Sequence, residues 1–167
     1  MGNTEPQKVK GHLLVVEDDL SARQAMEAFL THEGYEVRCA PNGQTALMFV
    51  QEEPPELILL DIRLPDIDGY EVCQRLKKEE RTNNIPVIFM SALHELKDKV
   101  RGFAVGGVDY VAKPFQAEEL LARLETHLTL KRLQKQIEAQ NEQLQCSQDE
   151  LEEKINERTA DLAAANR

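Results

Sequence analysis

Residues 57–72 read LILLDIRLPDIDGYEV. The first four of them, LILL (57–60), form the most continuous apolar run of the chain and predict a buried β-strand. Asp61 follows this run directly. The next segment, LPDIDG (64–69), is typical of a loop and of a helix start, and it leads into a predicted helix over 69–81. A buried strand, a loop and a helix together form the repeating unit of a parallel α/β sheet.

The same alternation extends on both sides of this stretch. Strands are predicted at 12–16, 35–40, 57–60, 85–90 and 109–112. Helices are predicted at 20–33, 43–53, 69–81, 94–104 and from just after Pro114. Near-continuous apolar strands that alternate with helices indicate a parallel sheet covered on both faces. The sequence therefore predicts an α/β fold with a doubly wound, five-stranded parallel sheet.

The composition excludes several classes of protein. The 167 residues include 20 Lys and Arg against 30 Asp and Glu, a net charge of -10, which argues against direct binding to nucleic acid or to an anionic membrane surface. No apolar run approaches the roughly 20 residues that cross a bilayer, and the first residues lack the apolar core of a signal peptide. The three cysteines are odd in number and far apart, which fits a reducing compartment. We expect an acidic, soluble, cytoplasmic protein.

Charged side chains follow three of the predicted strands. Glu17, Asp18 and Asp19 come after the first strand, Asp61 after the third and Lys113 after the fifth, and Ser91 follows the fourth. Ligands of doubly wound folds bind beyond the carboxyl ends of the strands. Converging carboxylates need a cation between them, and oxygen ligands suit Mg²⁺. A lysine at the same place suits an anion such as phosphate. The pattern therefore predicts a site for Mg²⁺ and a phosphoryl group.

Four motifs in order carry a resemblance to a known family. They are LLVVEDD (13–19), LILLDIRLPDIDGYEV (57–72), VIFMSA (87–92) and DYVAKPF (109–115). With them, residues 11–126 resemble the receiver domain of two-component response regulators over their whole length. The resemblance implies the flavodoxin-like (βα)5 receiver fold. It also implies a signalling domain that receives a phosphoryl group from a histidine kinase or a phosphotransfer protein, and no enzyme activity beyond this self-catalysed transfer and autodephosphorylation.

The resemblance also implies a role for each matching residue. Asp61 becomes the phosphoacceptor and a metal ligand, Asp18 the direct Mg²⁺ ligand, Glu17 a ligand through water, and Arg63 a ligand through its backbone carbonyl. Lys113 pairs with the phosphoryl group and precedes an expected cis peptide bond to Pro114. Ser91 and Tyr110 are the two switch positions. Two departures are Glu17, where aspartate is common, and Arg63, which places a long cation at the rim.

Three other classes of function compete with this interpretation. A flavin-binding electron carrier needs a Ser/Thr- and Gly-rich phosphate loop after the first strand, where this chain has Glu17, Asp18 and Asp19. A Mg²⁺-dependent phosphohydrolase on a similar sheet needs a second acid two residues after the nucleophile, where this chain has Arg63. A constitutive dimerisation or adaptor module with a vestigial site is the third alternative, although all the required groups are present. For single residues the simpler interpretations are helix capping by Asp19, Asp66 and Asp68, and packing or solvation for the four histidines.

The last part of the chain differs in composition from the rest. From residue 127 onward it has no Gly, Pro or aromatic residue, and a helix is predicted from Gln116 to about Ala164, on the order of 70 Å long. Leucine or isoleucine recurs every seven residues at 130, 137, 144 and 151, and isoleucine and leucine at 155 and 162 continue a second row. We therefore expect a flexible tail at 1–10, a receiver at 11–126, and a coiled-coil helix at 127–167 that continues the last receiver helix.

The heptad rows allow two registers. With the first row at d, Asn141 and Gln148 occupy a positions and favour a parallel dimer through residues 130–162. With the first row at a, Leu133 enters the seam while Ile155 and Leu162 leave it. A solitary solvated helix is the remaining alternative. INERTADLAAANR (155–167) resembles the signalling helices that join receivers to output domains, so we expect an output domain beyond Arg167, or else an adaptor that acts alone.

Overall fold

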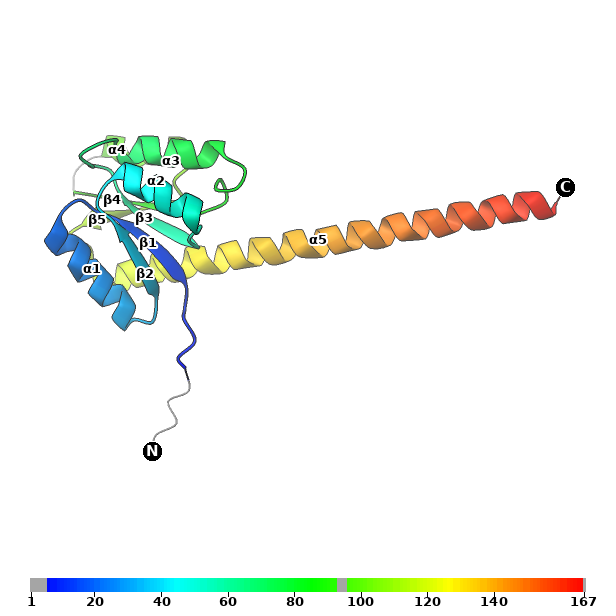
Figure 1. The fold of residues 1–167 in the computed structure, drawn as a ribbon, viewed down its shortest axis with the longest axis horizontal. Helices are drawn as coiled ribbons and strands as arrows, with labels where there is room; N and C mark the ends of the chain where they lie inside the picture. The colour runs from blue at the N-terminus through cyan, green and yellow to red at the C-terminus, as the bar shows by residue number, and fades with distance from the viewer. Residues whose placement is uncertain (1–5, 93–95, 167) are drawn as a thin grey trace, which may run out of the picture. The chain divides into compact units, whose positions relative to one another are not determined.

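A computed structural model describes residues 6–92 and 96–166, without the side chains of residues 96–98. Strands and helices alternate along the chain in the order expected (Figure 1). The strands are β1 (His12–Val16), β2 (Glu36–Ala40), β3 (Leu57–Asp61), β4 (Val87–Ala92) and β5 (Asp109–Lys113). The helices are α1 (Leu20–His32), α2 (Gly43–Glu52), α3 (Gly69–Lys78), α4 (Leu96–Ala104) and α5 (Ala117–Ala165). His94 and residues 1–5 of the expected tail lie outside the described residues.

All five strands form one parallel sheet in the order β2-β1-β3-β4-β5. The chain leaves β1 toward β2 on one side and continues with β3 on the other, so the strand order reverses between β1 and β3. The register places Val16 beside Leu60 and Asp61 beside Met90. The predicted doubly wound, five-stranded fold is therefore confirmed, and the carboxyl ends of β1 and β3 adjoin at its switch point.

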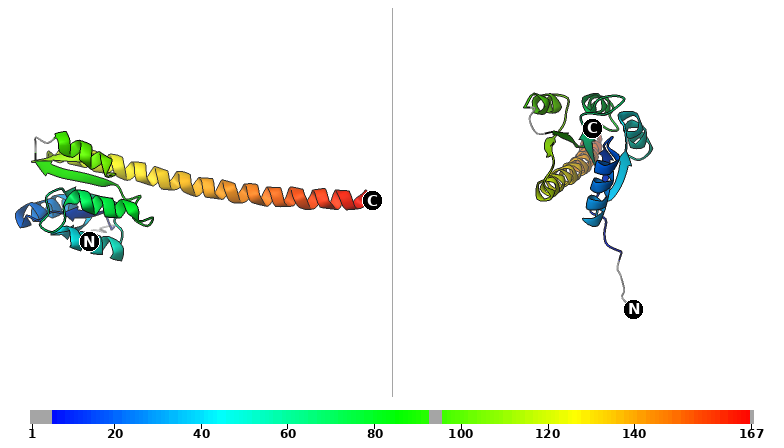
Figure 2. Two further views of the ribbon diagram at one scale, coloured as in Figure 1. Left: turned by 90° about the horizontal axis from the view of Figure 1, so that it is seen from above. Right: turned by 90° about the vertical axis from the view of Figure 1, so that its left-hand side faces the viewer.

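Helices cover both faces of this sheet (Figure 2, right). On one face α2 and α3 pack on strand residues such as Leu14, Ile58 and Phe89. On the other face α1 and the first turns of α5 pack on the alternate strand residues, among them Val15 and Leu59. Since successive side chains of a strand point to opposite faces, each strand supplies both clusters, which explains the continuous apolar runs in the sequence.

Helix α3 and strand β4 differ most from the predicted boundaries. Helix α3 ends at Lys78 rather than at residue 81, because Glu79 adopts an extended conformation. The buried Thr82 hydroxyl donates to the Leu76 carbonyl at 2.6 Å and satisfies that helix end. Strand β4 begins at Val87 and extends to Ala92, two residues beyond the predicted end, because Ser91 and Ala92 pair with Ala112 and Lys113 of β5. Ser91 therefore lies within the strand.

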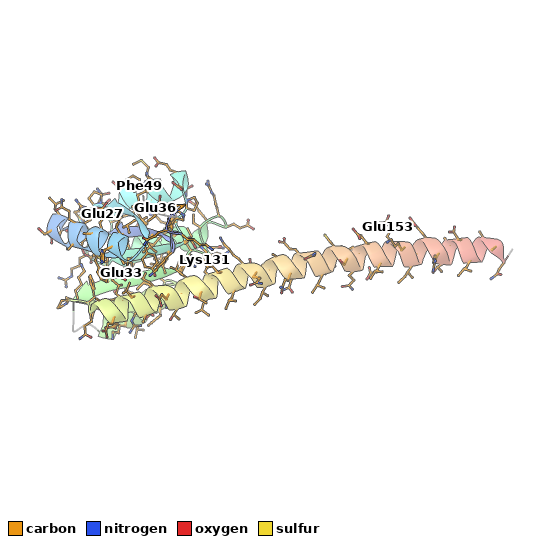
Figure 3. All side chains as sticks on the ribbon, turned by 90° about the horizontal axis from the view of Figure 1, so that it is seen from below. Glu27, Glu33, Glu36, Phe49, Lys131 and Glu153 are labelled. Atoms are coloured by element: carbon orange, nitrogen blue, oxygen red, sulfur yellow. The ribbon has the colours of Figure 1, made fainter. Side chains whose placement is uncertain are left out.

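Helix α5 is continuous from Ala117 to Ala165, which confirms the predicted long C-terminal helix. The chain divides into two compact units, Met1–Lys131 and Arg132–Arg167, and the second contains only the later part of α5. Described side chains project from every side of this part, as around Glu153 in Figure 3, and all are exposed. They include Leu133, Ile137, Leu144, Leu151, Ile155 and Leu162. Among the helices described, none is long and apolar enough to cross a membrane.

Candidate functional site

Glu17 follows β1 directly and is held at four of its atoms. Its backbone N–H donates to the Ala40 carbonyl at 3.1 Å, and its own carbonyl accepts from the Arg23 guanidinium at 2.9 Å. In the side chain, Oε1 accepts from the Asp19 N–H at 3.2 Å and Oε2 accepts from Lys113 Nζ. The residue is only 2% exposed. Glu17 is therefore a fixed, buried carboxylate at the switch point of the sheet.

Asp61, the last residue of β3, is also buried and held at both carboxylate oxygens. Oδ1 accepts from the Arg63 backbone N–H at 3.0 Å, and Oδ2 accepts from Lys113 Nζ at 2.7 Å. Lys113 ends β5, and its ammonium group thus bridges Asp61 and Glu17. The peptide bond from Lys113 to Pro114 is cis, as expected. One lysine therefore joins groups that three strands deliver.

Burial and charge act against each other at this bridge. Burial lowers the pKa of Lys113, but the hydrogen bonds and negative charges of Asp61 and Glu17 outweigh it, and the pKa is raised on balance. For Glu17, burial raises the pKa and the negative charge of Asp61 raises it further. The hydrogen bond from Lys113 lowers it, but the pKa of Glu17 is raised on balance. Lys113 is therefore held as a cation between the two carboxylates.

Asp18 completes a group of three carboxylates. Unlike its two neighbours it is exposed, and one oxygen from each of Glu17, Asp18 and Asp61 lies within 4.8 Å of the others. Three carboxylates and one ammonium leave a net charge of -2 when all are ionised. An all-oxygen set with one solvent-facing member suits a small, hard divalent cation that keeps several waters. The residues present therefore fit Mg²⁺.

The two expected switch residues share one hydrogen-bond acceptor. The Ser91 hydroxyl donates to the Ala92 carbonyl at 3.4 Å, and the Tyr110 hydroxyl donates to the same oxygen at 3.4 Å. The Tyr110 ring is buried, with Lys99 Nζ 5.1 Å from its centroid. Tyr110 thus already packs inward, with its hydroxyl next to the strand that carries Ser91.

Arg63 lies at the rim with an exposed side chain, and its backbone N–H binds Asp61 as described above. Its carbonyl stays a predicted metal ligand.

Asp19 caps α1 by accepting from the Ala22 N–H at 3.1 Å, and Asp68 caps α3 by accepting from the Glu71 N–H at 2.8 Å. These two capping predictions are confirmed.

Three further residues shape the site, and of these only Asp66 was expected to act, as a helix cap. Asp66 accepts from Gly43 N at 2.9 Å and Gln44 N at 2.8 Å, so it caps α2 from another loop. Gly69 allows α3 to approach β3, since a Cβ there would lie 2.4 Å from the Asp61 carbonyl oxygen. Arg23 binds the backbone of the acid pair. The dipeptide DG at 68–69 could have predicted the role of Gly69. The contacts of Asp66 and Arg23 join separate segments of the chain, and no local sequence pattern predicts them.

Comparisons with known proteins agree with this geometry. The family model described as the response regulator receiver domain matches residues 13–125. A probable transcriptional regulator, ycf27 of Porphyra purpurea, is 45% identical over 124 residues, which are 74% of this chain and 49% of the relative. A DNA-binding dual master transcriptional regulator, RpaA of Synechocystis, is 41% identical over 112 residues, covering 67% of this chain and 46% of the relative.

Solved structures give the same result. The crystal structure of a putative response regulator from Chloroflexus aurantiacus superposes with a TM-score of 0.69 at 36% identity. The similarity covers 71% of this chain and 98% of that one. The chain thus spans nearly the whole of that protein but only about half the length of the curated relatives it matches.

Proposed function

Because this chain belongs to the response regulator receiver domain family, we propose that residues 11–126 are the phosphoacceptor receiver of a two-component phosphorelay. Asp61 takes the phosphoryl group from the phosphohistidine of a histidine kinase or of a phosphotransfer protein. The observation that carries this proposal is the bridge from Lys113 to Glu17 and Asp61, which gathers a buried acceptor, a cation and an acid pair at one edge of the sheet.

Asp61 and Lys113 account for most of the phosphoryl-transfer chemistry. A carboxylate oxygen of Asp61 forms the new bond to phosphorus while the bond from phosphorus to the donor imidazole nitrogen breaks, and its electron pair stays on the imidazole. Phosphoryl transfer depends mainly on in-line positioning and on neutralisation of the equatorial oxygens. Lys113, already held as a cation beside Asp61, neutralises part of that charge. Water later releases the phosphoryl group from Asp61.

We assign the metal site to Mg²⁺. Asp18 and Asp61 would hold the ion directly, Glu17 would act through water, and the backbone carbonyl of Arg63 would add a fourth group. When bound, Mg²⁺ supplies positive charge to the phosphoryl oxygens. The burial of Glu17 and its contact with Lys113, against the exposure of Asp18, support this division between the two members of the acid pair.

The switch consists of Ser91 and Tyr110. A phosphoryl group on Asp61 draws the Ser91 hydroxyl toward its oxygens, and the hydroxyl then leaves the Ala92 carbonyl, which also accepts from Tyr110. The phosphoryl group thereby favours one of two packings around β4 and β5, which is a population shift. The shared acceptor supports a coupling of the two residues.

The helical unit after Lys131 is proposed to form a parallel homodimer. Its heptad residues Ile137, Leu144 and Leu151 are each more than half exposed in the single chain, and a second copy buries such a row.

The relatives are about twice as long as the matched segment, and one is named DNA-binding. The acidic balance of this chain opposes direct contact with nucleic acid, so we place any such activity in an output domain beyond Arg167. Free cysteines at 39, 73 and 146 support a cytoplasmic location.

Intact-mass analysis after treatment with acetyl phosphate and Mg²⁺ tests the phosphoacceptor. The unmodified chain gains one phosphoryl group, and Asp61→Asn gains none. Asp68→Asn is the matched control, since it removes a nearby carboxylate but asparagine caps a helix as well as aspartate does. Equal labelling of Asp61→Asn and the unmodified chain would refute the assignment.

A further inference from the structure

Arg23 lies in the first turn of α1, on the backbone side of the acid pair. Its Nη1 donates to the Glu17 carbonyl at 2.9 Å and to the Asp18 carbonyl at 3.3 Å. Its own N–H donates to the Asp19 carbonyl at 2.9 Å in the first turn of the helix. One residue of α1 therefore contacts the carbonyl groups of all three acids that follow β1.

These contacts oppose a repulsion built into the site. The carboxylates of Glu17, Asp18 and Asp61 lie close together, and without a bound cation like charges at such distances favour separation. Glu17 is buried and held through Lys113, whereas the Asp18 side chain is exposed. The loop backbone must therefore resist the displacement of Asp18, and a guanidinium, which stays charged at every relevant pH, is a strong donor to its carbonyl groups.

We propose that Arg23 is a positioning residue of the phosphoacceptor site, which holds the Glu17–Asp18 backbone so that both carboxylates point toward Asp61. This inference rests on the proposed function, because it assigns Arg23 a part in cation binding at that same site. Arg23 touches neither the cation nor the phosphoryl group in this role. It acts by keeping the acid pair preorganised before either arrives.

A purely structural role predicts a different response. If Arg23 only fastens α1 to the sheet, its removal lowers the melting temperature and leaves the Mg²⁺ affinity of the folded protein unchanged. If Arg23 holds mutually repelling acids together, its removal relieves that repulsion, so the stability in metal-free buffer changes little while the Mg²⁺ affinity falls. The ratio of the two effects separates the roles.

The test compares Arg23→Met, Arg23→Lys and the control Arg75→Met, which removes an exposed arginine paired with Glu71 on α3. Isothermal titration with MgCl2 and thermal unfolding in metal-free buffer are measured on the full chain. Arg23→Met is expected to weaken Mg²⁺ binding about 10-fold, since partners behind a metal ligand have effects of this size. Arg23→Lys restores part of the affinity, because an ammonium reaches one carbonyl but lacks the planar fork. Arg75→Met binds as the unmodified chain does.

Two outcomes overturn the inference: unchanged Mg²⁺ affinity in Arg23→Met, or an equal loss in Arg75→Met. If Arg23→Met does not fold, Arg23→Lys decides the matter, and an affinity equal to that of the unmodified chain refutes the role. Failure of the proposed function is visible separately, because the unmodified chain would then bind no Mg²⁺ and take no phosphoryl group at Asp61.

Discussion

Lys113 Nζ contacts Asp61 Oδ2 at 2.7 Å although β4 separates the two strands that carry these residues. The lysine side chain reaches across the end of β4 and also meets Glu17 from β1. Its single charge therefore neutralises part of two buried carboxylates at once. This arrangement connects the stability of the metal-free protein to the site, because the same contacts that hold Lys113 also keep Glu17 and Asp61 buried.

Lys113→Met should destabilise the metal-free protein while leaving Mg²⁺ binding largely intact. The substitution keeps the apolar stem but leaves the buried Glu17 carboxylate without its partner, at a cost of roughly 1–3 kcal/mol in the free energy of unfolding. Phosphorylation of Asp61 should also be impaired. Urea unfolding and magnesium titration measure the first two effects, with the exposed Lys78→Met as control. A collapse of Mg²⁺ affinity would show that the lysine supports the metal rather than the phosphoryl group.

Asp18→Asn should have the opposite balance of effects. Removal of one of three clustered carboxylates relieves repulsion, so the melting temperature in metal-free buffer should stay the same or rise slightly. Magnesium affinity and phosphorylation should both fall strongly. Asp19→Asn provides the control, since asparagine preserves the cap of α1. A large loss of stability in Asp18→Asn without metal would identify Asp18 as a structural residue.

Gly69→Ala should disturb the phosphoacceptor through the backbone. The added Cβ would lie 2.4 Å from the Asp61 carbonyl oxygen and 2.9 Å from the Ile62 Cα, so α3 must move away from β3. We expect a loss of about 1–3 kcal/mol in the free energy of unfolding, as for overpacking elsewhere, together with slower phosphorylation. Urea unfolding and intact-mass kinetics test both. Unchanged values for stability and rate would mean that α3 shifts at no cost.

The stability that Asp109 contributes to the folded protein should be lost in acid. Burial alone would raise the pKa of Asp109, but hydrogen bonds from Arg123 and His127 of α5 and from the Tyr110 N–H lower it below the ordinary value. A carboxyl group with a lowered pKa stabilises the folded state above its unfolded pKa of about 4, and this contribution is lost as the pH falls through the folded value.

Asp109→Asn should therefore lower the free energy of unfolding by about 1–2 kcal/mol at pH 7. The loss should be much smaller at a pH low enough to protonate Asp109 in the folded protein. Unfolding by urea at a series of pH values measures the difference. Asp161→Asn, an exposed substitution in the later part of α5, should leave the acid dependence as it is. A constant difference between Asp109→Asn and the unmodified chain at all pH values would show that the charge of Asp109 contributes nothing.

The sequence predicts the centre of the site better than its supports. Asp61 and Lys113 end buried apolar runs, and parallel strands bring such ends to one edge, so their meeting follows from strand order alone. The contacts of Arg23 and Asp66 depend on the paths of separate loops, which carry no periodic pattern. The later end of β4 likewise depends on pairing of Ser91 with Ala112 in β5, a tertiary contact. Local propensity does not contain this information.

Cysteine substitution should report on the proposed seam of the coiled coil. Leu144 occupies a seam position in either register, whereas Cys146, which is exposed, falls at an outer position in both. Leu144→Cys combined with Cys146→Ala should therefore form a disulfide-linked dimer under mild oxidation, and the chain with only its natural cysteines should cross-link far less. Non-reducing electrophoresis shows the difference. Preferential cross-linking through Cys146 would place the seam on another face of the helix.

Truncation after Lys131 should separate the receiver from dimerisation. The cut falls at the boundary of the two compact units and keeps Leu128, which is 3% exposed in the core, so the remaining receiver should stay folded. It removes Ile137, Leu144 and Leu151, and with them the apolar row that a second copy would bury. Light scattering at concentrations on the order of tens of micromolar should then show a dimer for the full chain and a monomer for the truncated one. Both should accept one phosphoryl group at Asp61. A monomeric full chain would refute the homodimer and leave the receiver assignment intact, because the phosphoacceptor site lies wholly within the first unit.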